Sequence, residues 1–262
     1  MPALTDRKSD TFVKLLWLGN SGVGKTGGLA PLALAGYQLR VLDFDNGLDA
    51  LANIIRAAKP AALANVSYES IRDSYVASPL GPIIRGSPRA FVSAIKLLDK
   101  WSDATVPADW GPNHVLVIDS LTNLSRAAFA WAVALNPGSK EPRQWYSGAQ
   151  KAIEDVLAIL TAEDFHANVI VISHVETIRQ TDGTDKGFPT SIGKALAPKI
   201  ARFFNNMVLT ESTGQGASVR RSIRTMPTAF IDLKNAAPPA KMSVTYPLET
   251  GILDIFNLLK SE

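Results

Sequence analysis

The chain has 262 residues, of which 46% are hydrophobic and 19% are charged, and its formal net charge is +3. This composition predicts one large or two small folded domains with a sizeable core and excludes wholesale disorder. The absence of cysteine excludes disulfides, thiolate metal sites and a cysteine nucleophile. The three histidines lie far apart in the sequence, which argues against a zinc site.

Residues 1–10 are polar and charged, and we expect them to be flexible. They lack the apolar segment of a signal peptide, and no apolar run in the chain reaches the length of a membrane span. We therefore expect a cytoplasmic protein without a membrane partner. The mild basic excess permits nucleic-acid binding without requiring it.

Residues 19–26 fit G-x-x-x-x-G-K-[ST], the phosphate-binding P-loop. A predicted strand at 12–18 precedes the loop and a predicted helix at 26–35 follows it, which is the context the motif needs. The glycines let backbone amides point at one anion, and the helix N-terminus adds partial positive charge. Lys25 should reach the β- and γ-phosphates of ATP, and the Thr26 hydroxyl should bind Mg²⁺. The residues expected to bind nucleotide are Gly19, Asn20, Ser21, Gly22, Val23, Gly24, Lys25 and Thr26.

The remaining elements are predicted from hydrophobic pattern and turn residues. Further strands are expected at 38–45, 65–72, 115–120, 169–173, 207–211 and 219–225. Further helices are expected at 47–59, 87–101, 121–135, 145–162, 192–204 and 253–259, and Ser87 followed by Pro88 should cap the second of these. The longer loops are expected at 74–86, 102–113, 136–143 and 175–191.

Buried strands that alternate with helices predict an α/β fold with a largely parallel central sheet flanked by helices. We find neither repeats nor a linker, so we expect a single domain with its core at 12–235. Residues 236–262 should form a C-terminal tail with a short helix.

Polar residues follow four of the predicted strands, at the sheet edge where ligands bind in such folds. One of these is Asp119, which follows Val-Leu-Val-Ile in the Walker B arrangement. We expect it to hold the Mg²⁺ shell. The alternative is that Asp119 caps the next helix, and Ser120 is an equal candidate for that cap.

Asp45 ends the strand after the P-loop helix and could polarise the water that attacks the γ-phosphate. Asp43 is the competing candidate, and strand alternation predicts that both carboxylates face the same side. The alternative for Asp45 is a turn-forming role with Asn46 and Gly47.

His174 follows the buried strand at 169–173. It could hydrogen-bond the γ-phosphate and report its loss to the loop that follows. The alternative is a helix-capping or core histidine.

The order of these motifs resembles the RecA-type recombinase ATPase core. The matching features are Walker A, the acidic strand end at 42–47, Walker B with Asp119-Ser120, and the strand end Ser173-His174. More narrowly, the chain resembles short phage RecA-core proteins linked to recombination and single-strand annealing. Two further stretches sharpen this resemblance, which spans residues 12–235: Arg224-Thr225-Met226-Pro227 and Leu233-Lys234-Asn235.

The resemblance implies that Lys25, Asp45, Asp119 and His174 are catalytic and that Thr26 and Asp119 bind the metal. Asp45 stands where the family usually has a glutamate, which implies slow hydrolysis or a water-mediated contact. The segment 175–190 would be the second DNA-binding loop, and 136–146 would lie near the first. The implied DNA-binding residues are Lys140, Arg143, Arg179, Lys186 and Phe188.

Lys234 would match a basic residue offered to a neighbouring subunit's ATP, although Ala236 stands where an arginine is expected. A second basic cluster, Arg220, Arg221 and Arg224, carries no assigned role beyond general DNA contact.

These features together predict an ATP- and Mg²⁺-dependent RecA-type ATPase that binds single-stranded DNA and assists homologous recombination or strand annealing. We expect it to be phage-encoded, to act in the host cytoplasm, and to form a ring or filament of identical subunits. A single-stranded-DNA-binding protein is a further expected partner. The alternatives are an NTP-switched protein-binding module and a helicase- or packaging-type motor.

Overall fold

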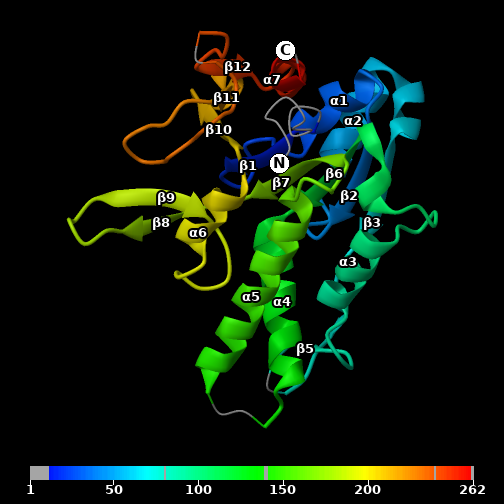
Figure 1. The fold of residues 1–262 in the computed structure, drawn as a ribbon, viewed down its shortest axis with the longest axis vertical. Helices are drawn as coiled ribbons and strands as arrows, with labels where there is room; N and C mark the ends of the chain where they lie inside the picture. The colour runs from blue at the N-terminus through cyan, green and yellow to red at the C-terminus, as the bar shows by residue number, and fades with distance from the viewer. Residues whose placement is uncertain (1–11, 80, 139–140, 239, 261–262) are drawn as a thin grey trace, which may run out of the picture.

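The fold is organised around an eight-stranded sheet, shown for the computed structural model in Figure 1. The described residues are 12–79, 81–138, 141–238 and 240–260. The sheet order is β12-β11-β10-β1-β7-β6-β2-β3. The strands are β1 (Lys14–Gly19), β2 (Gln38–Asp43), β3 (Val66–Ser70), β6 (Gly111–Asp119), β7 (Ala167–Ser173), β10 (Asn206–Thr213), β11 (Arg220–Arg224) and β12 (Thr245–Pro247).

All neighbours from β3 to β10 pair in parallel, whereas β10, β11 and β12 pair antiparallel. The expected α/β fold with a largely parallel central sheet is therefore confirmed. The carboxyl ends of β1, β2, β6 and β7 meet at one edge, because parallel strands all end on the same side. This edge carries the P-loop, Asp45, Asp119 and His174, which end or follow these four strands.

Alternate residues of the central strands enter two separate cores, one on each face of the sheet. In β1, Leu16 and Leu18 belong to one core and Leu15 and Trp17 to the other. The first face is covered by α3 (Ala90–Asp99), α4 (Leu121–Leu135), α5 (Pro142–Thr161) and α6 (Ala197–Ile200). The second is covered by α1 (Ala30–Leu34), α2 (Asp49–Ala58) and α7 (Gly251–Lys260). Burial on both faces explains why these strands are apolar throughout.

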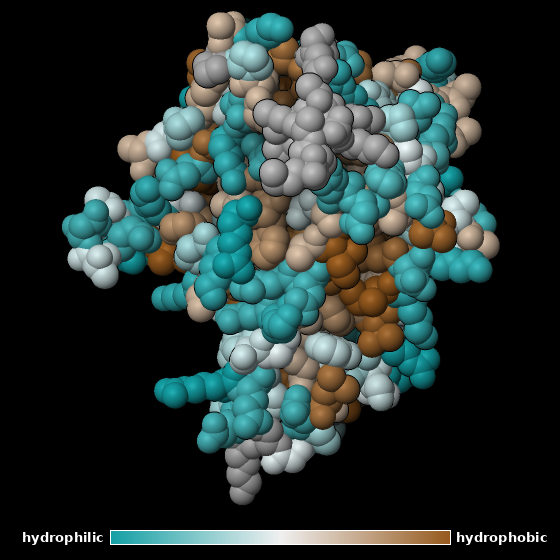
Figure 2. Space-filling model, viewed as in Figure 1, coloured by the Kyte–Doolittle hydropathy of each residue, from teal (hydrophilic) through white to brown (hydrophobic). Residues whose placement is uncertain are grey.

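Two hairpins extend from this body in Figure 1. One is the helical pair α4 and α5. The other is the two-stranded arm of β8 (Val175–Arg179) and β9 (Asp185–Pro189). Figure 2 shows hydrophilic side chains along this arm and hydrophobic ones gathered over α3.

The predicted loop at 175–191 is wrong, because most of it forms the β8–β9 hairpin. Its turn depends on Gly183, at φ 84°, and on Asp182, whose Oδ1 accepts the backbone N–H of Thr184 at 2.9 Å. The arm is anchored to the body midway along β9, where the Gly187 N–H donates to the Phe230 carbonyl at 2.7 Å. The sequence hides this hairpin because its strands are short and mostly polar.

Some other predicted boundaries also shift. The helix expected at 26–35 is a 3₁₀ turn at Gly27–Leu29 followed by the short α1, as a Gly-Gly pair and Pro31 favour. The loop expected at 74–86 contains a small hairpin of β4 (Tyr75–Val76) and β5 (Ile83–Ile84). The helix expected at 192–204 is helical only from Ala197, as α6 and a 3₁₀ turn. The 3₁₀ turn after α6 is Ala201–Phe203. The remaining 3₁₀ turns are Pro60–Asn65, Pro107–Asp109 and Gly216–Ser218.

The cap predicted at Ser87 is also wrong. Helix α3 begins at Ala90, and the distant Asp73 caps it by accepting the N–H groups of Arg89 and Ala90 at 2.6 and 3.0 Å. The C-terminal helix is confirmed as α7, whereas the flexibility expected for residues 1–10 lies outside the described residues. Among the described residues, no helix combines the length and apolar character needed to span a bilayer.

Candidate active site

The P-loop joins β1 to the 3₁₀ turn before α1 and surrounds the amine of Lys25. Gly22 and Gly24 have φ angles of 78° and 95°, in the region that favours glycine. Lys25 is buried, and its Nζ donates to the carbonyls of Gly19 at 2.7 Å and Asn20 at 2.8 Å. Since an ammonium has three donors, one N–H remains for a phosphate oxygen. Burial lowers the Lys25 pKa to about 8, so the amine is mostly charged at pH 7.

Thr26 and Asp119 meet at the adjoining strand end, where Thr26 Oγ1 donates to Asp119 Oδ2 at 2.7 Å. Burial raises the pKa of Asp119 to about 6, and the Thr26 hydrogen bond opposes that shift. Adjacent oxygen ligands of an octahedral Mg²⁺ lie about 2.9 Å apart, so this pair fits two neighbouring positions of that ion. In the described part of the chain no three His, Cys, Asp or Glu side chains form a metal cluster. The other ligands would therefore be phosphate oxygens and water.

Asp45 is held by two donors from the region after the Walker B strand. Its Oδ1 accepts the Ser120 hydroxyl at 2.9 Å and Asn123 Nδ2 at 2.7 Å. Ser120 is therefore not the side-chain cap of α4, which has no such bond. The half-buried carboxylate is fixed beside the P-loop and Asp119, where a water-polarising group would act.

Asp43 has a different role from Asp45. Strand β2 ends at Asp43, and its buried Oδ1 accepts the N–H groups of Asp45 at 3.1 Å and Asn46 at 2.7 Å. Asn46 adopts φ 56° within this turn. The strand alternation on which the expectation of a shared side rests ends at Asp43, and the two carboxylates have different hydrogen-bond partners. Asp43 forms the turn, and Asp45 remains available for chemistry.

His174 connects β7 to α4. Its backbone N–H donates to Thr122 Oγ1 at 3.2 Å, and its ring Nδ1 lies 3.1 Å from the same oxygen. Burial, with a smaller effect from Lys25, lowers the His174 pKa, so the ring is neutral at pH 7. Since β7 lies between β1 and β6, His174 lies between the P-loop strand and the Walker B strand. It leads directly into β8, so it caps no helix.

Three residues of this region have no role in the nucleotide site that the sequence predicts. Thr122 and Asn123 lie in the first turn of α4 and match no motif. Arg221 lies against the P-loop: its Cδ and Nη1 are 3.4 and 3.6 Å from where a Cβ on Gly24 would stand. Its guanidinium has no hydrogen-bond or ion-pair partner among the described residues. Only the pairing of β11 into the sheet reveals this position.

The residues predicted to bind DNA are only partly brought together. Arg179, Lys186 and Phe188 share the β8–β9 arm, where Arg179 pairs with Asp185 at 3.0 Å and Lys186 with Asp232 at 3.1 Å. Arg143 is exposed at the start of α5, on the other hairpin. Lys140 lies outside the described residues.

Lys234 is exposed and lies beside the amino-terminal half of β10. Its carbonyl accepts the Met207 N–H at 2.6 Å, and Met207 is level with Leu16 of β1. Lys234 therefore lies away from the carboxyl ends of the strands, where the P-loop begins. Arg224 of the second basic cluster pairs with Glu211 at 2.7 Å.

Solved structures similar to the chain include three of low identity. A KaiC-like protein from Pyrococcus horikoshii is 13% identical, and the match has a TM-score of 0.43. It covers 90% of this chain and 84% of the KaiC-like chain. A type III secretion system ATPase of pathogenic bacteria is 15% identical, with a TM-score of 0.46. This match covers 76% of this chain and 52% of the secretion ATPase. The flagellar accessory protein FlaH from Methanocaldococcus jannaschii is 8% identical, with a TM-score of 0.40. This match covers 84% of this chain and 79% of the FlaH chain.

A comparison with curated proteins finds no match. A family described as AAA domain matches residues 11–236, which include the P-loop, Asp45, Asp119 and His174. This match covers most of the chain and agrees with the P-loop geometry. The chain belongs to the AAA domain family and is a P-loop ATPase.

Proposed function

We propose that this ATPase binds single-stranded DNA, couples that binding to its nucleotide state, and assists recombination or strand annealing. The observation that carries the proposal is the contact of His174 with Thr122. It joins the root of the β8–β9 arm to the root of the α4–α5 hairpin, beside the P-loop. A change at the γ-phosphate position would therefore reach both hairpins at once.

The proposed chemistry assigns one task to each side chain. Lys25 would neutralise phosphate charge with its remaining N–H, and Asp45 would orient the attacking water and accept its proton. Ser120 and Asn123 keep Asp45 in place. Thr26 and Asp119 would hold Mg²⁺, whose charge offsets that of the phosphates.

The β8–β9 arm supplies the proposed DNA contacts. The ion pairs of Arg179 and Lys186 are exposed, and exposed pairs contribute only about 0–1 kcal/mol each. DNA phosphates could therefore replace Asp185 and Asp232 as partners at little cost. Phe188 on the same arm would stack on a base.

We also propose self-association in a ring or filament. Lys234 is away from the strand ends that form its own P-loop site and is exposed to solvent. This placement supports a contact with the nucleotide of a neighbouring subunit, as the RecA resemblance implies. A single-stranded-DNA-binding protein would be a further partner on the same DNA.

A second candidate function is an NTP-switched protein-binding module. The exposed apolar side chains of Val92 and Ile95 on α3 favour it, since such a patch suits a protein partner. DNA binding that weakens steeply with salt would favour the first function over this one.

The test is the affinity for a fluorescent oligothymidylate, measured by anisotropy at several salt concentrations. We expect the double variant Arg179→Ala/Lys186→Ala to bind DNA about 10- to 100-fold more weakly, because each guanidinium or ammonium contact is charge-assisted. The matched control is Arg56→Ala/Lys59→Ala, which removes the same charge from exposed positions at the end of α2. Equal affinities of the two double variants would contradict the arm as the DNA contact.

A further inference from the structure

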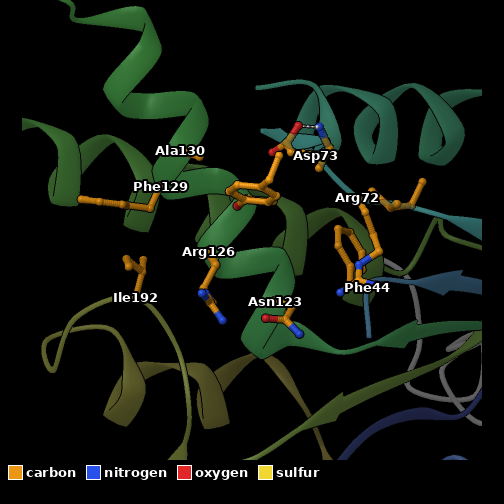
Figure 3. A pocket seen from close by; sticks show the side chains of 12 residues that line it. Phe44, Arg72, Asp73, Asn123, Arg126, Phe129, Ala130 and Ile192 are labelled. Carbon is orange, nitrogen blue, oxygen red and sulfur yellow. Dashed lines mark hydrogen bonds between the residues drawn. The ribbon is translucent and has the colours of Figure 1, made fainter. Parts of the chain in front are cut away.

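A cavity of about 520 Å³ lies next to the catalytic residues, on the α4 side of the sheet. Figure 3 shows Asn123 and Arg126 of α4 on one side of it and Arg72 and Phe44 on the other. Ile192, from the segment after β9, closes a third side. None of these residues belongs to the P-loop, so this is a second site beside the nucleotide site.

The residues that line the cavity carry more positive than negative charge, with two arginines and one acid. Arg72 and Arg126 line it, are exposed, and have no hydrogen-bond or ion-pair partner in the part of the chain that the structure describes. The only acid among its lining residues is Asp73, whose Oδ1 accepts the N–H groups of Arg89 and Ala90 and which forms no ion pair with either arginine in the described part of the chain. Two guanidinium groups around one cavity suit a phosphate, which they can bind in bidentate fashion.

The cavity also offers aromatic surface. Tyr75 lines it and is 62% exposed, and Phe129 lines it from α4. Phe129 is held by Tyr146, whose ring centroid lies 4.7 Å away. Arginines without protein partners beside an exposed ring, Tyr75, and a partly buried one, Phe129, are the combination that binds single-stranded nucleic acid, through its backbone and through base stacking.

We infer that this cavity binds one nucleotide unit of single-stranded DNA, with Arg72 and Arg126 on its phosphate and Tyr75 or Phe129 against its base. The inference rests on the proposed DNA-binding function and adds a contact site away from the β8–β9 arm.

Asn123 connects the cavity to hydrolysis. The same side chain lines the cavity and donates to Asp45 at 2.7 Å. A nucleotide that contacts Asn123 shifts or fixes the carboxylate that orients water. DNA in the cavity therefore changes the rate of ATP hydrolysis, and Asn123 acts as a positioning residue.

The test compares Arg72→Ala/Arg126→Ala with wild type and with Arg56→Ala/Lys59→Ala. We expect the cavity variant to bind oligothymidylate about 10- to 100-fold more weakly. The slope of its affinity against salt should fall by about 0.7 for each phosphate that the variant no longer neutralises. ATP turnover without DNA should stay within about twofold of wild type, since neither arginine touches the catalytic residues.

Each other outcome overturns the inference in a distinguishable way. If wild type binds DNA and the cavity variant binds as the control does, the cavity is not a DNA site, while the proposed function stands. If wild type binds no DNA, both fail. If inorganic phosphate at millimolar concentration competes fully with the oligonucleotide, or if the variant changes only the oligomeric state, the cavity is a free-anion site or a subunit interface instead.

The coupling has its own test in Asn123→Ala. We expect the DNA affinity to remain within about threefold of wild type, because the two arginines are intact. Stimulation of kcat by DNA should be abolished while KM for ATP is little changed. Stimulation equal to that of wild type would refute the connection through Asn123.

Discussion

Asn123 Nδ2 lies 2.7 Å from Asp45 Oδ1, and this contact joins the helix after the Walker B strand to the carboxylate after β2. Together with the Ser120 hydroxyl, it fixes the shorter aspartate side chain where a water-orienting group is needed. Asp45 therefore differs in role from Asp43, whose carboxylate accepts the N–H groups of the turn.

Asp45→Asn should lower kcat by about 10²- to 10⁴-fold, the range of a general base, with ATP affinity little changed. The matched variant is Asp43→Asn, whose amide oxygen can still accept the turn N–H groups, so its turnover should remain near that of wild type. Phosphate release under saturating ATP measures both. If Asp43→Asn were the more damaging variant, the two roles would be reversed.

Arg221→Ala should weaken ATP binding by about 10-fold, because an unpartnered guanidinium beside Gly24 is within reach of a bound nucleotide. Arg220→Ala is the control variant, since neighbouring residues of a strand point to opposite faces. Titration with labelled nucleotide compares the two variants. A similar affinity for both would exclude Arg221 from the nucleotide site.

Thr122→Val keeps the side-chain shape and removes the oxygen that His174 contacts. We expect ATP binding and turnover without DNA to be retained and the response of turnover to DNA to disappear. The measurement is ATP turnover across an oligonucleotide titration. An unchanged DNA response would show that the coupling does not pass through this contact.

Lys14 should give the folded protein a distinct pH dependence. Its Nζ donates to the carbonyls of Phe165 and Ala167 at 2.6 and 2.8 Å, and burial lowers its pKa to about 7. Between pH 7 and about 10 the unfolded chain holds this proton more tightly than the folded one, so this group makes the free energy of unfolding rise with pH.

Lys14→Met removes that contribution. The difference in unfolding free energy, wild type minus variant, should therefore increase from pH 7 to pH 10. Urea unfolding at four pH values measures it. A difference that stays constant would mean that Lys14 titrates normally in the folded protein.

The sequence alone predicted the layered fold and the P-loop–Asp119 pair, because these depend on local patterns. A strand–Gly-rich loop–helix sequence and an apolar strand that ends in an acid each carry their own signal. Their meeting at one sheet edge follows from parallel pairing.

The rest depends on contacts between distant segments, which no local pattern encodes. Asp73 accepts the N–H of Arg89, sixteen residues later, at the start of α3, and Arg221 reaches Gly24 only through the pairing of β11. The β8–β9 arm shows no clear apolar alternation, and its turn at Gly183 and its contact with Phe230 carry no sequence signal that distinguishes it from a loop. The roles of Asn123 and Thr122 follow only from their contacts with Asp45 and His174, which lie far from them in the sequence.

Coupling between nucleotide and DNA is decided by the affinity for oligothymidylate with and without Mg-ATP, measured alongside ATP turnover in the same samples. Lys25→Ala serves as the nucleotide-binding control. We predict that Mg-ATP tightens DNA binding by wild type but not by Lys25→Ala, and that DNA changes turnover. Nucleotide binding without any DNA binding, or a DNA affinity that is the same with and without nucleotide in both proteins, would show that this ATPase does not couple nucleotide state to DNA binding.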